Sequence, residues 1–258
     1  MEDEVTLLAY LQPALPYIGI EGQSKISRKI KIHANVLTPA SLDPWKDFTI
    51  DKIMQPTQNL TAVATILRHP MFPSPPLPIT YKYGLVSRVM QHVVPRVQTS
   101  LKTSFVHLQE KHCTHMVAFT PVSLYTMKVP GTEVKRNGTP VMDLAFCQIG
   151  TTTPRAVGIV ELSRKFNSDM RTGNATQQQT YKRYLAHLNY YMSTSGSRYG
   201  FILTNRELVV VRRCVGGITS LEVADPVEWY MGGTEDRPAL TILLALWYIG
   251  MLAAKDDM

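Results

Sequence analysis

The sequence has few cysteines and no apolar run long enough to cross a bilayer. Its three cysteines, Cys113, Cys147 and Cys214, are far apart and form no Cys-x-x-Cys pair, which argues against a zinc site or a disulfide framework. The most apolar stretch, residues 239–254, falls short of the roughly 20 residues that span a membrane. We therefore expect a buried C-terminal helix there and no membrane partner.

The N-terminus also lacks the basic residues and following apolar run of a secretory signal, since it opens with Met-Glu-Asp-Glu. We accordingly expect an intracellular protein, cytoplasmic or nuclear. The chain has 258 residues, of which 45% are apolar, so it can bury a large core and is not a disordered chain.

Prolines divide the chain into two regions. The run from Pro70 to Pro78 cannot hold a helix or a central strand. We interpret residues 1–80 as an N-terminal accessory region that ends in this proline-rich connector. Residues 81–258 are predicted to form an α/β core with a C-terminal helix. The apolar spacing at the start of this core predicts helical structure from Lys82 to His112, interrupted at Pro95.

The middle of the chain gives the clearest pattern of strands and helices. Strands are expected at residues 141–147, 156–162, 199–204 and 208–213, with a helix at residues 177–192 between the second and third. The second strand is almost wholly apolar, as in a sheet centre that is covered on both faces. The fold class is therefore α/β, and any chemistry is expected between Asp143 and Arg213.

Positive charge is concentrated in the same part of the chain. Residues 161–213 contain nine lysines and arginines but only three acids, in a chain of net charge +7. Such a concentration favours a polyanionic partner such as nucleic acid, through neutralisation of phosphates. A solvated basic face without a partner is the alternative. The candidate nucleic-acid-binding residues are Arg183, Arg198, Arg212 and Arg213.

Two acidic residues lie within or at the end of predicted apolar strands. Asp143 lies within the first predicted strand and Glu161 ends the second. Burying an ionised carboxylate is costly unless it is paired or binds a metal, and two such acids suit Mg²⁺. If the second strand continues, alternation places Lys165 on the same side as Glu161. In the alternative interpretation Glu161 pairs with a nearby basic residue, Arg164, Lys182 or Arg183, and Asp143 caps a turn.

These residues resemble the PD-(D/E)xK nuclease superfamily. The resemblance covers Asp143, Glu161-x-Ser163, Gln177-x-x-x-Tyr181 and the run Tyr199-Gly-Phe-Ile-Leu-Thr, about 75 residues in all. The sequence is most similar to the RecB-like branch and resembles uncharacterised fungal proteins that share the run Ser-Arg-Tyr-Gly-Phe. The resemblance implies a restriction-endonuclease-like mixed central sheet flanked by helices, with the two acids around Mg²⁺ and with Gln177 and Tyr181 arranging the site.

The sequence departs from this family at the lysine position, which is Ser163. Lys165, or Lys182 on the helix, is the candidate substitute. The proline of the first motif is also displaced, to Pro140, and Glu110 is the candidate for a further upstream acid. Gln177 and Tyr181 share one helix face, so either both face the acids or Tyr181 is core and Gln177 is surface.

Three hypotheses about function follow. The first is a Mg²⁺-dependent nuclease with a migrated lysine. The second is an inactive nuclease-fold module that binds nucleic acid or protein, and the third is a cleft of the same fold used for small-molecule chemistry. The candidate catalytic residues are Asp143, Glu161, Lys165, Gln177, Tyr181 and Lys182.

Overall fold

The computed structural model describes residues 3–22, 39, 41–71, 77–108, 116–121, 143–151, 153–214 and 220–255. Its α-helices are α1 (Leu7–Leu11), α2 (Ile50–Val63), α3 (Lys82–His92), α4 (Val94–Leu108), α5 (Ala175–Thr194) and α6 (Ile242–Lys255). Its strands are β1 (Glu4–Thr6), β2 (Ser41–Pro44), β3 (Thr65–Leu67), β4 (Val117–Pro121), β5 (Leu144–Gln148), β6 (Pro154–Val160), β7 (Tyr199–Leu203), β8 (Glu207–Arg213), β9 (Ser220–Val223) and β10 (Val227–Glu228). A short 3-10 helix, η2 (Ser168–Arg171), precedes α5.

The central sheet is mixed, with strands in the order β2-β9-β8-β7-β6-β5-β4. The pairs β6–β7 and β2–β9 are parallel, and the other neighbours in this order are antiparallel. β10 pairs with the start of β8, while β1 and β3 form a separate two-stranded sheet. α5 lies in the connection between β6 and β7, because two parallel strands need a long crossover between them.

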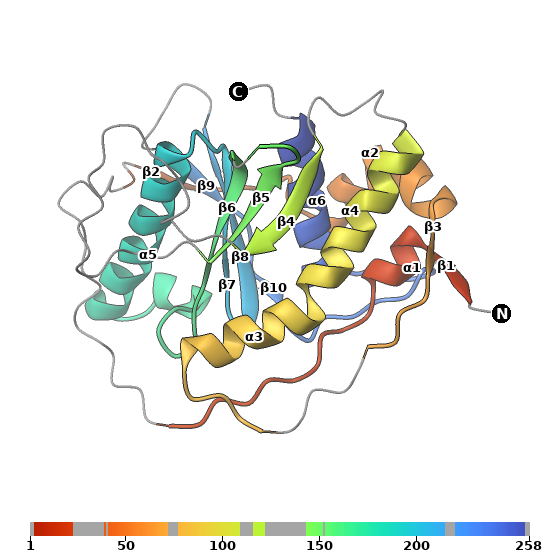
Figure 1. Cartoon of the computed structure of the whole chain (residues 1–258). Helices are drawn as coiled ribbons and strands as arrows, with labels where there is room; N and C mark the ends of the chain where they lie inside the picture. The colour runs from red at the N-terminus through yellow and green to blue at the C-terminus, as the bar shows by residue number, and fades with distance from the viewer. Residues whose placement is uncertain are drawn as a thin grey trace.

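Helices cover both faces of the central sheet (Figure 1). α5 packs against β6 and β7 on one face, and α4 and α6 cover the other. Side chains of β6 alternate between the two sides: Val157 and Ile159 pack in the cluster with α5, whereas Ala156 and Val160 pack in the cluster with α6. Every residue of β6 is buried, which confirms the prediction of a central strand.

The described residues of the N-terminal region share this core. β2 extends the central sheet by pairing with β9. Leu11 of α1 and Trp45, just after β2, are buried in the same hydrophobic cluster as Trp247 of α6. The described part of residues 1–80 therefore shares a core with the described part of residues 81–258 and is not an accessory unit set apart from it. Most of the predicted proline-rich connector, residues 72–76, lies outside the described residues.

Several elements expected from the sequence agree with the structure to within a few residues at their ends. α3 and α4 meet beside Pro95, and β5 to β8 and α5 lie where strands and a helix were predicted. α6 is buried along most of its length. No helix in the described part of the chain is both long and apolar enough to cross a membrane. The α/β class, with a large mixed sheet flanked by helices, is confirmed.

Candidate active site

Asp143 and Glu161 lie at the same end of the two central strands β5 and β6. Asp143 immediately precedes β5, and Glu161 immediately follows β6. Because the two strands are antiparallel partners, the start of β5 lies beside the end of β6. Alternation directs both acidic side chains to the face covered by α5, since Ala145 and Ile159 pack on that face.

The carboxylate of Asp143 is buried and held by protein donors. Its Oδ2 accepts the N–H of Val160 at 2.8 Å and lies 2.7 Å from Nζ of Lys82, the first residue of α3. The Asp143 N–H donates to the carbonyl of Gly158 at 3.2 Å. Burial raises the pKa of the Asp143 carboxyl, the Lys82 ammonium opposes that rise, and the charge of Glu161 adds to it. The two acids are therefore close enough to interact electrostatically.

Glu161 is 8% exposed and is also held by protein groups. Its Oε1 accepts the N–H of Leu162 at 2.9 Å and lies 3.4 Å from Nζ of Lys165, while its Oε2 accepts the hydroxyl proton of Tyr184 at 3.3 Å. Burial, and then the nearby Glu161 charge, raise the pKa of Tyr184, so the phenol stays protonated and donates. The acid cluster is the set Asp143, Glu161, Lys82, Lys165 and Tyr184.

Lys165 reaches Glu161 through a turn. β6 ends before Glu161, and the N–H groups of Lys165 and Phe166 both donate to the carbonyl of Leu162, at 2.8 and 3.2 Å. The strand therefore does not continue to residue 165, which was the condition for placing Lys165 beside Glu161 by alternation. The four-residue spacing within a turn, and not strand alternation, returns the Lys165 ammonium to the carboxylate.

Two further side chains fix this turn. The side-chain oxygen of Asn205 accepts the N–H of Ser163 at 3.0 Å. Arg164 donates from Nη2 to the carbonyl of Thr80 at 2.5 Å, and from Nη1 to the carbonyls of residues 21 and 22. Arg164 therefore binds backbone oxygens and does not pair with Glu161. It ties the turn to the segment just before α3, which places Lys82 beside the acids.

The side of α5 that faces the acids carries Tyr184 and Tyr191. Burial raises the pKa of Tyr191, and the charge of Asp143 adds to this rise. The Tyr191 hydroxyl is buried and has no hydrogen-bond partner among the described residues. The ring of His187 lies between them on the helix and contacts Tyr191, with centroids 4.7 Å apart. None of these three residues belongs to the Gln-x-x-x-Tyr motif found in the sequence.

Tyr181, the motif tyrosine, lies in the core beside the acid cluster. Its ring stacks on Phe166, with centroids 5.4 Å apart, and Phe166 in turn contacts the ring of Tyr184 at 5.1 Å. Burial raises the pKa of Tyr181 to about 12; the charge of Arg171 opposes this rise and that of Glu207 adds to it. Tyr181 is therefore linked to Glu161 only indirectly: it packs on Phe166, Phe166 packs against Tyr184, and Tyr184 donates to Glu161.

Gln177 caps the N-terminus of α5. The side-chain oxygen of Asn174 accepts the Gln177 N–H at 3.0 Å, and the side-chain oxygen of Gln177 accepts the Asn174 N–H at 2.9 Å. This reciprocal pair is a capping box, which satisfies backbone donors that the first turn leaves free. Gln177 is exposed and precedes Tyr184 by about two helical turns. The structure thus gives it a role in starting the helix and places it outside the acid cluster.

Replacing Asn174 or Gln177 by alanine is expected to lower the free energy of unfolding by about 1 kcal/mol, because each change removes a capping hydrogen bond. Chemical denaturation would measure this loss. Gln179→Ala, at an exposed position in the same turn, is the matched control and should be close to neutral. A Gln177→Ala protein of unchanged stability that no longer bound divalent cations would show that the glutamine belongs to the site instead.

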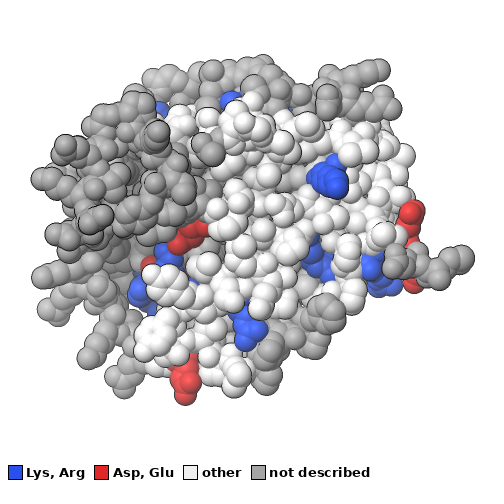
Figure 2. Space-filling model, in the orientation of Figure 1, with Lys and Arg blue, Asp and Glu red and all other residues white. Residues whose placement is uncertain are grey.

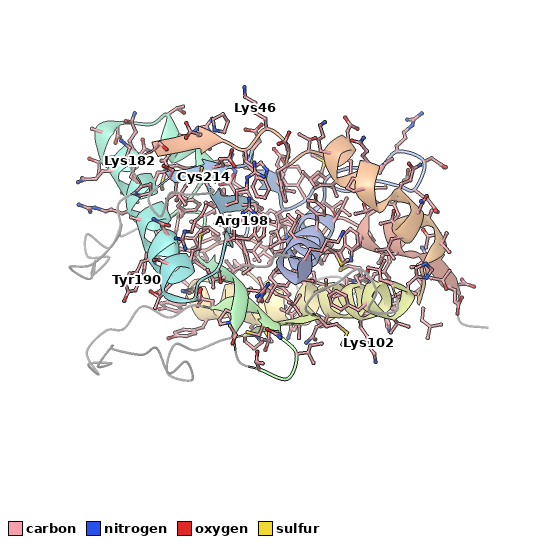
Figure 3. The ribbon with its side chains drawn as sticks, turned by 90° about the horizontal axis from the view of Figure 1, so that it is seen from above. Lys46, Lys102, Lys182, Tyr190, Arg198 and Cys214 are labelled. Carbon is pink, nitrogen blue, oxygen red and sulfur yellow. The ribbon has the colours of Figure 1, made fainter. Side chains whose placement is uncertain are left out.

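Neither Lys182 nor Arg183 is among the hydrogen-bond and ion-pair partners of Asp143 and Glu161 in the described part of the chain. Lys182 is exposed and projects outward from α5 (Figure 3), and Arg183 is half-buried on the same helix. Figure 2 shows one face of the molecule, on which lysines and arginines are scattered and do not form a continuous patch.

The three arginines of the β7–β8 region lie at the opposite end of the sheet from Glu161. Tyr199 of β7 pairs with Ala156 at the start of β6 and with Arg212 at the end of β8. Arg198 precedes Tyr199 in sequence, and Arg213 follows Arg212. Arg212 forms an ion pair with Glu222, and its guanidinium lies 4.5 Å from the centroid of the Trp45 ring. The charge that is concentrated in the sequence is therefore not concentrated around the acids in space.

The two carboxylates are a donor set for a hard cation. Among the described residues, no group of three His, Cys, Asp or Glu side chains could hold a metal ion, and Glu110 lies outside those residues. A structural zinc site needs four nitrogen or sulfur ligands, whereas Mg²⁺ is commonly held by one or two carboxylates and several waters. Both the Val160 N–H and the Lys82 ammonium contact the Asp143 carboxylate through Oδ2. Asp143 and Glu161 therefore fit Mg²⁺ better than zinc.

Comparison with known proteins adds no relative. The chain matches no protein-family model, no curated protein and no solved structure. Any inference about function therefore depends on the chemistry of the acid cluster.

Proposed function

We propose that this chain is a divalent-cation-dependent nuclease with a restriction-endonuclease-like fold, in which Asp143 and Glu161 are the ligands of Mg²⁺. The observation that carries the proposal is the pair of buried carboxylates at adjacent strand ends, both facing α5 and interacting electrostatically. The order β5, β6, α5, β7, with one acid at each of the first two strands, agrees with what the resemblance to PD-(D/E)xK nucleases implies.

The proposed reaction is hydrolysis of a phosphodiester bond. The oxygen of a water molecule bonds to phosphorus and gives up one proton to solvent, the bridging P–O bond breaks, and the departing oxygen takes up one proton from solvent. A bound Mg²⁺ would polarise the phosphodiester and lower the pKa of its bound water. Asp143 and Glu161 supply the negative charge that holds the cation. Tyr184 orients Glu161 by donating its hydroxyl proton to Oε2.

Two other lysines lie beside the acids and are the candidates to replace the lysine that the family carries at position 163. Position 163 is serine, but Nζ of Lys165 lies 3.4 Å from Glu161 and Nζ of Lys82 lies 2.7 Å from Asp143. Both side chains are partly exposed, at 33% and 27%, so each ammonium can meet a ligand from solvent. In the proposed nuclease these cations hold the non-bridging phosphate oxygens and offset the charge that develops on them.

One observation favours a second candidate, an inactive module of the same fold. Each carboxylate is already neutralised by a lysine and bound by a backbone N–H. With serine at position 163, these ion pairs would then be structural, and the module would bind nucleic acid or protein without cutting. The two candidates differ in whether a divalent cation displaces the lysines from the acids.

Calorimetric titration with Mn²⁺ or Mg²⁺, together with a cleavage assay on single-stranded and duplex DNA and RNA, tests the proposal. The protein is expected to bind a divalent cation and to cut nucleic acid only in its presence. Asp143→Asn should weaken cation binding by more than about 100-fold, because it removes one of only two protein ligands. The same variant should abolish cleavage.

Asp169→Asn is the control for this experiment. It removes one negative charge from the exposed ion pair with Arg206, whose atoms are 3.0 Å apart, and leaves the acid cluster intact. Cation binding and cleavage should be unchanged. If the unaltered protein bound no divalent cation at millimolar concentration and cut no substrate, the nuclease proposal would fail and the inactive module would stand.

A further inference from the structure

One buried tyrosine hydroxyl on α5 makes no hydrogen bond in the described part of the chain. The Tyr191 side chain is 1% exposed, and its hydroxyl is shielded from solvent without a hydrogen-bond partner among the described residues. A buried hydroxyl that makes no hydrogen bond destabilises a folded protein, so native structures usually pair such a group with protein atoms or an ordered ligand. The Tyr191 hydroxyl therefore has hydrogen-bonding capacity that the chain itself does not use.

The side of α5 that carries Tyr191 faces the strands of the two acids. A Cβ added at Gly200 of β7 would lie 2.7 Å from Sδ of Met192, so the Met192 side of the helix lies on β7. Tyr191 is turned from Met192 by about 100° around the helix axis, whereas it is only about 20° from Tyr184. Since Tyr184 reaches Glu161 at the end of β6, Tyr191 also faces β6 and its neighbour β5, and not β7.

The positions along the strands agree with this orientation. Asp143 donates its N–H to the Gly158 carbonyl and its side chain accepts the N–H of Val160, so it lies about two residues, or roughly 7 Å, before Glu161 along β6. α5 runs back in the same direction, because it connects the end of β6 to the start of the parallel strand β7. A helical side chain leans toward the N-terminus of its helix, which for Tyr191 is the direction of the acids.

The hydroxyl of Tyr191 is held in place and stays protonated. The ring of His187 lies 4.7 Å from the Tyr191 ring between centroids, and the ring of Tyr190 lies 6.0 Å away. Burial raises the pKa of Tyr191, and the charge of Asp143 adds to this rise. A protonated phenol can both donate a hydrogen bond and accept one. The group is thus a fixed, neutral partner for a ligand bound at the acids.

We propose that Tyr191 is a positioning residue of the cation site, whose hydroxyl accepts a hydrogen bond from a water molecule bound to the cation that Asp143 and Glu161 hold. The inference rests on the cation site of the proposed function and names one further residue of that site. Mg²⁺ bound by one or two carboxylates usually keeps several waters. A water in a buried site needs at least two polar partners, and the Tyr191 hydroxyl supplies one of them.

Calorimetric titration of Tyr191→Phe with Mn²⁺, in the full chain, would test the inference. The variant keeps the ring and loses only the hydroxyl. Its dissociation constant for Mn²⁺ should rise about tenfold or more, as is typical when a group that orients a metal ligand is removed. Without metal, its urea unfolding midpoint should equal or exceed that of the unaltered protein, because the lost hydroxyl made no hydrogen bond there.

Two matched variants separate positioning of the cation from support of the fold. Tyr190→Phe removes the hydroxyl of the neighbouring, half-buried tyrosine and should leave both the Mn²⁺ affinity and the unfolding midpoint unchanged. Tyr184→Phe removes the donor to Glu161 and should lower both. A Tyr191→Phe protein with unchanged Mn²⁺ affinity, or one that loses affinity only together with stability, would overturn the inference.

The two proposals fail in different ways. Mn²⁺ binding that weakens in Tyr191→Phe, without cleavage of any nucleic acid, would leave this inference intact and contradict the nuclease. Metal-dependent cleavage by a protein whose Mn²⁺ affinity does not depend on the Tyr191 hydroxyl would leave the nuclease intact and contradict the positioning role. No binding of Mn²⁺ at millimolar concentration would contradict both.

Discussion

Replacing Lys82 by methionine is expected to lower the free energy of unfolding by about 2–3 kcal/mol at about pH 8. Methionine keeps the apolar stem of the side chain but removes the ammonium that lies 2.7 Å from Oδ2 of Asp143. The Asp143 side chain is only 7% exposed, so its charge would remain buried without its partner. Removing one member of a buried ion pair costs about 3–5 kcal/mol, and the partial exposure of Lys82 reduces that figure.

The loss should depend on pH, because the pKa of Asp143 is raised in the folded protein. The folded protein then keeps this proton over a pH range in which the unfolded chain has released it, so stability falls as the pH rises through that range. The Lys82 ammonium limits the rise in pKa, and removing it extends the range upward. Near the unfolded-state pKa of about 3.9 the folded carboxyl is mostly protonated and the unfolded one is half protonated, so the two states differ little in bound protons and the variant should lose much less there.

Urea denaturation at about pH 4 and about pH 8 would measure both values. Lys102→Met, at an exposed position on α4, is the control and should change stability by less than about 0.5 kcal/mol. Adding Asp143→Asn to Lys82→Met should remove most of the pH dependence. An equal loss at both pH values would mean that the Lys82 side chain contributes by packing and not by its charge.

Gly158→Ala is expected to destabilise the protein by about 3 kcal/mol, at the upper end of the usual cost of overpacking. A Cβ added at Gly158 would lie 2.1 Å from the ring of Phe201, which is fully buried on the neighbouring strand. That ring cannot move freely, since it contacts Phe119 and Phe146 with centroids 6.1 Å away in each case. The Gly158 carbonyl also accepts the N–H of Asp143, so a shift of the strand would displace that acid.

Thermal unfolding of Gly158→Ala and of the double variant Gly158→Ala/Phe201→Leu would test this argument. The smaller leucine should recover part of the lost stability, because it frees the space that the new methyl group needs. Gly19→Ala is the matched control, since its Cβ would meet neighbouring atoms at 3.6 Å or more, an ordinary contact. A Gly158→Ala protein as stable as the unaltered one would show that the β6–β7 packing has room that the structure does not indicate.

The main elements could be predicted because their signals are local. The mostly apolar, buried runs of β6, β7 and β8 lie within short stretches of sequence. The acids were recognisable because a carboxylate at an apolar strand is unusual in itself. Their common orientation also follows from local rules, since alternation on two antiparallel partners sends both to the face under α5.

The rest of the site depends on contacts between distant parts of the chain. Lys82 lies beside Asp143 at the point where Arg164 ties the segment before α3 to the turn after β6. No spacing in the sequence links these residues. For a related reason, the sequence motif pointed to Tyr181 and not to the tyrosine that contacts Glu161. The capping box fixes where α5 begins, and the tyrosine that then reaches Glu161 is Tyr184, one turn beyond Tyr181.

The arginines show the opposite case, in which residues close in sequence lie far from the site. They are close in sequence, but the strand directions carry Arg198, Arg212 and Arg213 to the far end of the sheet from Glu161. Net charge along a sequence segment therefore did not predict the charge around the site. The placement of a basic residue depends on which end of its strand it occupies, which requires the topology.

A crystal soaked with Mn²⁺ at millimolar concentration gives the most direct test of the acid pair as a cation site. The anomalous difference map is expected to show one peak, about 2–2.5 Å from an oxygen of Asp143 and an oxygen of Glu161, with Lys82 or Lys165 moved away from its carboxylate. A map without a peak at that position, in which both lysines still bind their acids, would contradict the metal site and with it the proposed nuclease.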